Sequence, residues 1–137
     1  MSDNNLCTVV HCKKEKYDVY IGRPSKWGNH FTHLDRPTTA SIKVETREKA
    51  VEAYEQWIQT QPQLLADLHE LEGKILGCWC KSKTKFISCH GDILADLCNL
   101  MTTLRITETS ALIEIYKIKR NDLISNRLAL FNKSISN

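Results

Sequence analysis

The sequence predicts a single α/β domain in which a small mixed sheet carries packed helices in the order β–β–α–α–β–α. Short β-prone runs alternate with apolar residues at helical spacing, and no segment repeats. A chain of 137 residues that is 42% hydrophobic and 26% charged suits one globular core. We expect residues 1–103 to form this core. Residues 104–137 are expected to be a C-terminal extension that packs on the core or mediates homo-oligomerisation.

The first half of the chain supplies two strands and a helix. Residues 9–12 and 17–21 are β-prone runs separated by a charged turn, and both are predicted to be strands. Residues 30–42 show no clean period and are expected to form an irregular loop. Thr46 is a candidate N-cap for an amphipathic helix over residues 47–60.

A second helix and the remaining elements follow. Pro62 allows the second helix to start, and Gly73 is expected to end it. Residues 74–80 read as a buried strand, and a third helix is predicted to start near residues 89–92. Beyond it we expect a short strand over 104–107, a helix or strand over 111–118, and a final helical piece.

Composition excludes several classes of protein. No apolar run approaches the roughly 18 residues of a membrane span, and the first residues lack the pattern of a signal peptide. We therefore expect a cytoplasmic protein without a membrane partner, in the host cytoplasm if the source is a virus. In such a reducing compartment, the six cysteines are read as free thiols, metal ligands or catalytic groups.

Three thiols and an imidazole gather within thirteen residues. Cys78 and Cys80 are two apart in a predicted strand, so they project from one face while Trp79 packs into the core on the other. Cys89 and His90 return at the start of the third helix. Four ligands of these types suit tetrahedral zinc, and the sequence predicts no other cofactor.

The same cluster has two other interpretations. A helix N-terminus stabilises anions, so Cys89 would be a reactive thiolate there, with His90 and Asp92 moving protons as catalytic partners. Alternatively, Cys78 and Cys80 are small core residues, Asp92 favours the helix N-terminus, and His90 is a surface ring. The sequence leaves these three interpretations open.

A loop between two glycines carries candidate ligand-binding groups. Arg23 offers a fork of donors to a phosphate or carboxylate, and Lys26 adds a point charge. Trp27 is a candidate stacking surface, and Ser25 and Asn29 are candidate hydrogen-bonding groups. The loop is alternatively a tight turn in which Trp27 fills the core and Arg23 pairs with a carboxylate.

These segments resemble a small family of unknown function that is found in bacteria, bacteriophages and large DNA viruses. The resemblance covers roughly residues 8–100 and implies no established activity. Relatives tend to carry proline at the position of His30, and their link before the Cys-His-Gly-Asp motif is shorter than residues 81–88. The residues that carry the resemblance are 22–31, Tyr54, Trp57, 76–80 and 89–92.

The sequence thus supports two functional hypotheses. In the first, the domain binds a phosphorylated small molecule, nucleotide-like in chemistry, and either sequesters it as a signalling nucleotide or turns it over. In the second, it is a zinc-stabilised, non-enzymatic module that binds nucleic acid or a host protein. Lys81, Lys83 and Lys85 are the candidate basic strip for nucleic acid, or simply a solvated loop.

Overall fold

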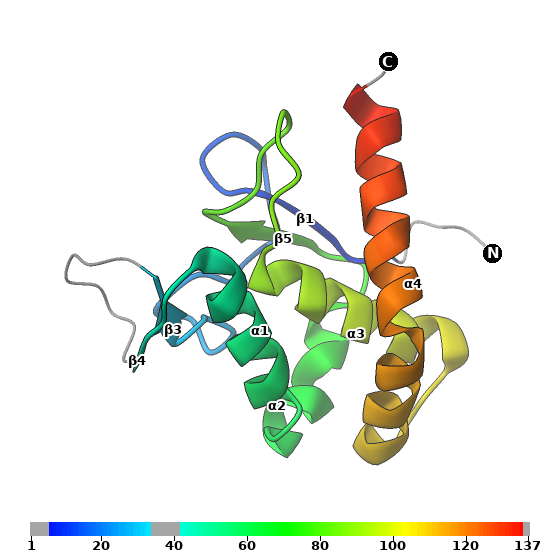
Figure 1. The fold of residues 1–137 in the computed structure, drawn as a ribbon. Coiled ribbons are helices and arrows are strands. Elements are labelled where there is room, and N and C mark those ends of the chain that lie inside the picture. Colours follow the sequence, from blue (N-terminus) through cyan, green and yellow to red (C-terminus); the bar gives the residue numbers. More distant parts are fainter. Residues whose placement is uncertain (1–5, 34–41, 136–137) are drawn as a thin grey trace.

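Three parallel strands form the main sheet of the protein. The computed structural model describes residues 6–33 and 42–135 (Figure 1). Strands β1 (Thr8–His11) and β2 (Val19–Tyr20) flank β5 (Ile75–Cys78) in the order β1-β5-β2, and both pair with β5 in parallel. The carboxyl ends of all three strands therefore lie at one edge of the sheet.

A second, smaller sheet pairs β3 (Phe31–Thr32) with β4 (Ile42–Lys43), also in parallel. The single α/β domain is confirmed, but every described strand pair is parallel, so the sheet is not mixed as expected. The reason is that β5 lies between β1 and β2, which a local reading of the sequence could not show. The predicted loop over residues 30–42 contains β3 and the first residue of β4, and its part 34–41 lies outside the described residues.

The first two helices begin and end close to where the sequence predicts. Helix α1 (Arg47–Ile58) is capped by Thr46, whose hydroxyl accepts a hydrogen bond from the backbone N–H three residues on. Helix α2 (Pro62–Ala66) starts at its proline and continues into a 3₁₀ turn, Asp67–Leu71. Gly73 then adopts φ 69°, a left-handed conformation that glycine tolerates without a Cβ penalty.

The C-terminal half differs from its prediction. Helix α3 (His90–Leu104) ends at Arg105, which is left-handed, and the N–H of Ile106 returns to the last turn of the helix. The predicted strand over residues 104–107 is therefore a helix end. Helix α4 (Thr109–Ile135) is one continuous helix where separate pieces were expected.

The first half of helix α4 supplies the residues that α4 buries in the core. Leu112 and Tyr116 are buried in the core, and the Tyr116 hydroxyl donates to the carboxylate of Glu55 in α1. Arg120 binds the same carboxylate at 2.6 Å, so α1 and α4 are joined through a buried charge. Neither α4 nor any other helix in the described part combines the length and apolarity that crossing a bilayer requires.

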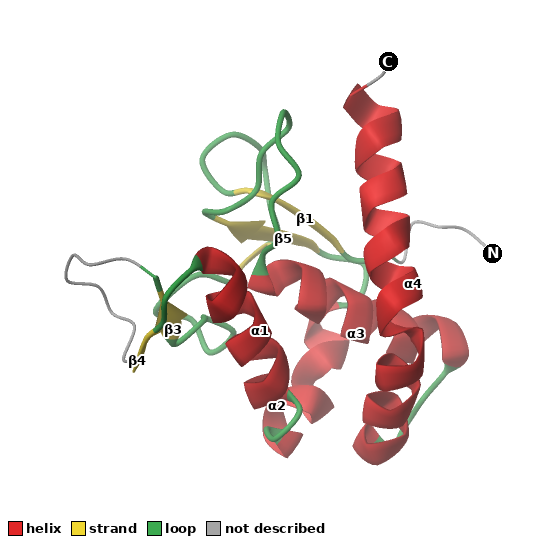
Figure 2. Cartoon of the chain, in the orientation of Figure 1, coloured by secondary structure: helices red, strands yellow, loops and turns green. Residues whose placement is uncertain are grey.

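The helices lie on one side of the main sheet (Figure 2). Helix α3 packs on β1 and β5, and its first turn meets the strands closely. A Cβ on Gly91 would lie 2.7 Å from the side chain of Ile21 and 2.9 Å from that of Val9. Any other residue at this position would have to displace these side chains, so glycine favours the close approach that brings the N-terminus of α3 to the carboxyl edge of the sheet.

Candidate functional site

A cleft of about 580 Å³ opens at the carboxyl ends of β2 and β5. We call it the β2–β5 cleft. Its wall combines the start of α1, the start of α3 and the turn that follows β2. In parallel α/β sheets, ligands bind at this edge. The side chains that carry its chemistry are Tyr20, Arg23, Arg47, Trp79, Cys80 and His90.

The aromatic wall of the cleft is fixed by a chain of hydrogen bonds. The indole N–H of Trp79 donates to the Tyr20 hydroxyl at 2.8 Å, and that hydroxyl donates to the carbonyl of Arg23 at 3.2 Å. A Cβ on Gly22 would lie 2.3 Å from the Tyr20 hydroxyl, so the arrangement requires glycine there. Trp79 was expected in the core but is 55% exposed, because β5 ends at Cys78 and the ring leans over the cleft instead.

Two arginines supply positive charge to the cleft. Arg23 donates one guanidinium N–H to the carbonyl of Asn29 at 2.9 Å, and Arg47 is the first residue of α1. Across residues 6–33 and 42–135, no carboxylate lies within ion-pair distance of either guanidinium. Positive charge without a carboxylate partner attracts anions, most strongly beside a helix N-terminus. Sequence reasoning missed Arg47, although its place directly after the Thr46 cap was a usable signal.

Three of the five loop residues predicted to bind ligand lie away from the cleft. Trp27 is 3% exposed and fills the core, where the Tyr54 hydroxyl donates to its carbonyl at 2.8 Å. Lys26 binds carboxylates of the 3₁₀ turn at 2.8 and 3.1 Å. Ser25 has a buried hydroxyl without a partner in the described part of the chain. The loop therefore contributes mainly Arg23 to the cleft.

Asn29 lines the cleft, but its side chain forms hydrogen bonds with backbone groups. Its amide N–H₂ donates to the carbonyl of Ala50 at 3.1 Å, and its amide oxygen accepts from the N–H of Phe31 at 2.9 Å. The side chain is 8% exposed. Asn29 thus ties the turn after β2 to α1, which holds Arg23 and the start of α1 around the same space.

His90 is buried at the inner end of the cleft and is not a surface ring. Its Nε2 lies 2.8 Å from the carbonyl of Ile21; a carbonyl only accepts, so Nε2 carries the proton. Burial lowers the pKa of His90 below its ordinary value, which keeps the ring neutral at pH 7. Its Nδ1 is then an acceptor and lies 3.9 Å from the sulfur of Cys89.

The three thiols of the cluster meet, but only one faces the cleft. The sulfurs of Cys78 and Cys89 are 2.9 Å apart and both residues are fully buried. Hydrogen bonds from Cys78 and then Cys89, helped by nearby positive charge including Arg47, hold the pKa of Cys80 well below its usual range. The same hydrogen bonds, together with burial, raise the pKa of Cys89. The accessible thiolate is therefore Cys80, whereas the sequence favoured Cys89.

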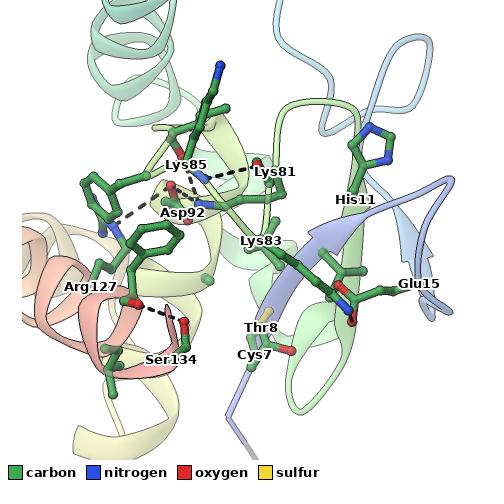
Figure 3. A pocket seen from close by; sticks show the side chains of 18 of the residues that line it. Cys7, Thr8, His11, Glu15, Lys81, Lys83, Lys85, Asp92, Arg127 and Ser134 are labelled. Atoms are coloured by element: carbon green, nitrogen blue, oxygen red, sulfur yellow. Dashed lines mark hydrogen bonds and ion pairs between the residues drawn. The ribbon is translucent and has the colours of Figure 1, made fainter. Parts of the chain in front are cut away.

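Asp92 is not brought together with His90 in the cleft. Its carboxylate accepts from the backbone N–H of Cys89 at 3.1 Å, completing a capping box at the start of α3. It also binds the Lys81 ammonium at 2.8 Å and lies on the wall of a separate groove (Figure 3). The geometry thus gives Asp92 a helix-capping position and leaves the predicted Cys89–His90–Asp92 relay unassembled.

The same geometry bears on the metal interpretation of the cluster. Within the described residues, no group of three or more histidine, cysteine or acidic side chains is arranged to hold a metal ion. Two thiolates on one tetrahedral zinc would lie roughly 3.7 Å apart, given zinc–sulfur bonds of about 2.3 Å. Cys78 and Cys89 are closer than that, so the zinc site stays a prediction that requires their sulfurs to separate.

The residues of the cleft lie in the part of the chain that is similar to known proteins. The sequence profile of a domain of unknown function, DUF4326, matches residues 9–100, which include every cleft residue named above. The chain is 34% identical over 102 residues to an uncharacterized 12.4 kDa protein in the nrdA-td intergenic region of Enterobacteria phage T4, covering 72% of this chain and 82% of that protein. It is 35% identical over 99 residues to the uncharacterized protein R718 of Acanthamoeba polyphaga mimivirus, covering 61% and 68%. No solved structure matches.

Proposed function

The chain belongs to the DUF4326 family, and we propose that it binds a phosphorylated, nucleotide-like small molecule in the β2–β5 cleft. One observation carries the proposal. Arg23 and Arg47, which have no carboxylate partner in the described part of the chain, face the same cleft as the exposed indole of Trp79. This combination offers charge for phosphate and a flat ring for a base.

The phosphate end of the ligand would lie between the two guanidiniums. Arginine presents a planar fork of donors that matches phosphate oxygens, and part of the Arg23 fork is already oriented by its bond to Asn29. The first turn of α1, where Arg47 lies, adds the positive end of a helix dipole. An anion would therefore gain from both side chains and from the backbone.

The other end of the ligand would contact Trp79. Stacking of a base on an aromatic ring contributes about 1–3 kcal/mol. The hydrogen bond to Tyr20 limits rotation of the indole, so little entropy is lost when a base stacks on it. A cleft of about 580 Å³ falls within the usual range for small-molecule sites, which supports a mononucleotide or a ligand of similar size.

Cys80 decides whether the ligand is held or turned over. A thiolate in the same cleft as Arg47 and the neutral ring of His90 has the chemistry of a nucleophile. A protein that only sequesters the ligand does not need a nucleophile. The two outcomes are separated by chromatography of the ligand after incubation with the full chain, with Cys80→Ser as the matched variant.

The alternative, a nucleic-acid-binding module, has less support. Two lysines of the candidate strip have carboxylate partners, since Lys81 binds Asp92 at 2.8 Å and Lys83 lies 3.8 Å from Glu15. The lysine strip therefore has fewer unpaired positive charges for nucleic acid than its sequence indicates. Salt-dependent binding to an oligonucleotide would support this alternative, because phosphate contacts release counterions.

Calorimetric titration of the full chain with a panel of AMP, ADP, ADP-ribose and cyclic dinucleotides tests the proposal. We expect at least one of them to bind, and Arg47→Ala to weaken that binding by about 10- to 100-fold, the loss of a charged hydrogen bond. Lys49→Ala is the matched control, because it removes a cation from the same turn of α1 outside the cleft. No binding by any panel member, or equal effects of the two variants, would refute it.

A further inference from the structure

A second groove, of about 640 Å³, runs along the outer edge of β1 (Figure 3). We call it the β1 groove. Six consecutive residues, 6–11, line it from the strand side, and α3, α4 and the loop over residues 81–87 form its other walls. Because a run of neighbouring strand residues lines it, the groove follows the backbone of β1 and not one side chain.

The outer edge of β1 presents backbone groups that the sheet does not use. β1 is the terminal strand in the order β1-β5-β2. The N–H groups of Thr8 and Cys12 bond to carbonyls of the β5 segment at 3.2 and 2.8 Å. Since alternate residues of a strand point their peptide groups to opposite sides, those of Cys7, Val9 and His11 face outward.

The side chain of Asn99 forms hydrogen bonds with this edge of β1, as a neighbouring strand would. From α3, its side-chain oxygen accepts from the N–H of Cys7 at 2.7 Å, and its N–H₂ donates to the carbonyl of Cys7 at 3.0 Å. These two bonds reproduce those of a neighbouring strand for one residue. Two residues along, the N–H and C=O of Val9 have no such partner within the described residues. Unpaired groups of this kind are a template for a further strand.

The charges around the groove favour an acidic occupant. The acidic residues of its lining are engaged: Asp92 and Asp96 bind Lys81 and Arg127, and Glu15 lies near Lys83. Lys14 and Lys85 also line the groove, and no carboxylate in the described part lies within ion-pair distance of them. Two cations of the lining therefore have no carboxylate partner in the described residues, whereas its carboxylates are paired.

The far wall of the groove is apolar. Phe86, on the loop, and Phe131, on α4, pack with ring centroids 5.6 Å apart, and Leu130 beside them is 68% exposed. A strand added to β1 has side chains on both of its faces, so it can offer apolar groups to this wall and acidic groups to the lysines that line the same groove. The groove thus fits a segment in which apolar and acidic residues alternate.

We propose that the β1 groove binds an extended, acidic segment of a partner protein, which adds a parallel or antiparallel strand to β1 at Val9. This site is separate from the β2–β5 cleft, and the two share no lining residue. Asn99 hydrogen-bonds the backbone of Cys7, and the partner segment would hydrogen-bond the backbone of Val9, the next outward-facing residue.

The test uses the full chain and a fluorescein-labelled ten-residue peptide in which glutamate alternates with valine and phenylalanine. We expect saturable binding, and amide hydrogen exchange at Val9 that slows at least tenfold in the complex while Thr8 and Cys12 change little. A peptide N-methylated at every residue keeps the side chains but cannot donate to β1. It should bind about 2- to 12-fold more weakly, since the hydrogen bond from the peptide to the Val9 carbonyl is lost.

Matched surface variants locate the site without endangering the fold. Lys85→Glu and Leu130→Asp should each weaken binding about fivefold or more, whereas Lys119→Glu and Ile118→Asp, exposed on α4 outside the groove, should not. Unchanged exchange at Val9, or equal binding of the N-methylated peptide, overturns the proposal. Slow amide exchange at Val9 in the free chain, caused by dimerisation, would also overturn it. Tighter binding of oligo(dT) than of the peptide would overturn it as well.

Discussion

The indole N–H of Trp79 donates to the hydroxyl of Tyr20 at 2.8 Å, linking the segment after β5 to β2 across the mouth of the cleft. The two residues are 59 positions apart in the sequence. Their contact holds a tryptophan that is 55% exposed in the wall of the cleft. An ordered, exposed ring is what a stacking site requires.

Replacing Trp79 should therefore weaken ligand binding more than it weakens the fold. We expect Trp79→Ala to lower the affinity for the nucleotide that binds the wild type by about 5- to 150-fold, the usual range for a stacked base. Trp79→Phe keeps a ring without the N–H, and its affinity should lie between those of the wild type and Trp79→Ala. Calorimetry measures both, and an affinity for Trp79→Ala equal to wild type would exclude stacking on this ring.

Cys80 should react as a thiolate across a wide range of pH. Because hydrogen bonds from Cys78 lower its pKa, its alkylation by iodoacetamide should change little between pH 8 and pH 6. An ordinary thiol, with a pKa of about 8.5, slows about tenfold for each pH unit over this range. Timed alkylation with peptide mapping measures the rate. Cys78→Ala removes the stronger of two hydrogen bonds to Cys80 and should make the rate depend more steeply on pH; a tenfold fall per unit in the wild type would contradict the assignment.

His90 should make the protein less stable in mild acid. Its pKa is lowered by burial, so in the folded state it stays neutral at a pH where the unfolded chain already binds a proton. Stability should therefore fall as the pH drops below about 6.5, by at most about 1.4 kcal/mol at pH 5.5 from this residue. Urea unfolding at pH 7.5 and 5.5 tests this. The loss should shrink in His90→Gln but persist in His69→Gln, an exposed control; equal losses in both variants would be inconsistent with a buried neutral ring.

The link between α1 and α4 should contribute strongly to stability. Tyr116 donates to the buried carboxylate of Glu55, and a hydrogen bond to a charged group is worth about 1.5–3 kcal/mol. Tyr116→Phe should lower the free energy of unfolding by about that amount, whereas Tyr17→Phe, at a ring that is 42% exposed, should change it by less than about 0.5 kcal/mol. Denaturation followed by circular dichroism compares them. If the two variants matched, residues beyond 104 would be an appendage and not part of the core.

Local signals explain which elements were predictable. The Thr46 cap, Pro62 and Gly73 act within a few residues of their own position, and the structure places helix ends there. The start of α3 near Cys89 was found for the same reason. The order of the strands was not predictable, because β5 enters between β1 and β2 from far along the chain.

The candidate site was only partly predictable because its parts come from distant segments. Arg23 was found from its loop, but Trp27 and Lys26 of the same loop turn toward the core and the 3₁₀ turn. His90 was identified, although its burial depends on Ile21 and Tyr54, which pack around it from elsewhere. Arg47 became a site residue only once α1 was placed beside the turn after β2.

The most direct test of the central claim is calorimetric titration of the wild type, Arg47→Ala and Lys49→Ala with the tightest-binding nucleotide of the panel. The β2–β5 cleft as a phosphate site predicts an affinity for Arg47→Ala about 10- to 100-fold below wild type and an unchanged affinity for Lys49→Ala. Equal affinities for all three proteins would contradict it.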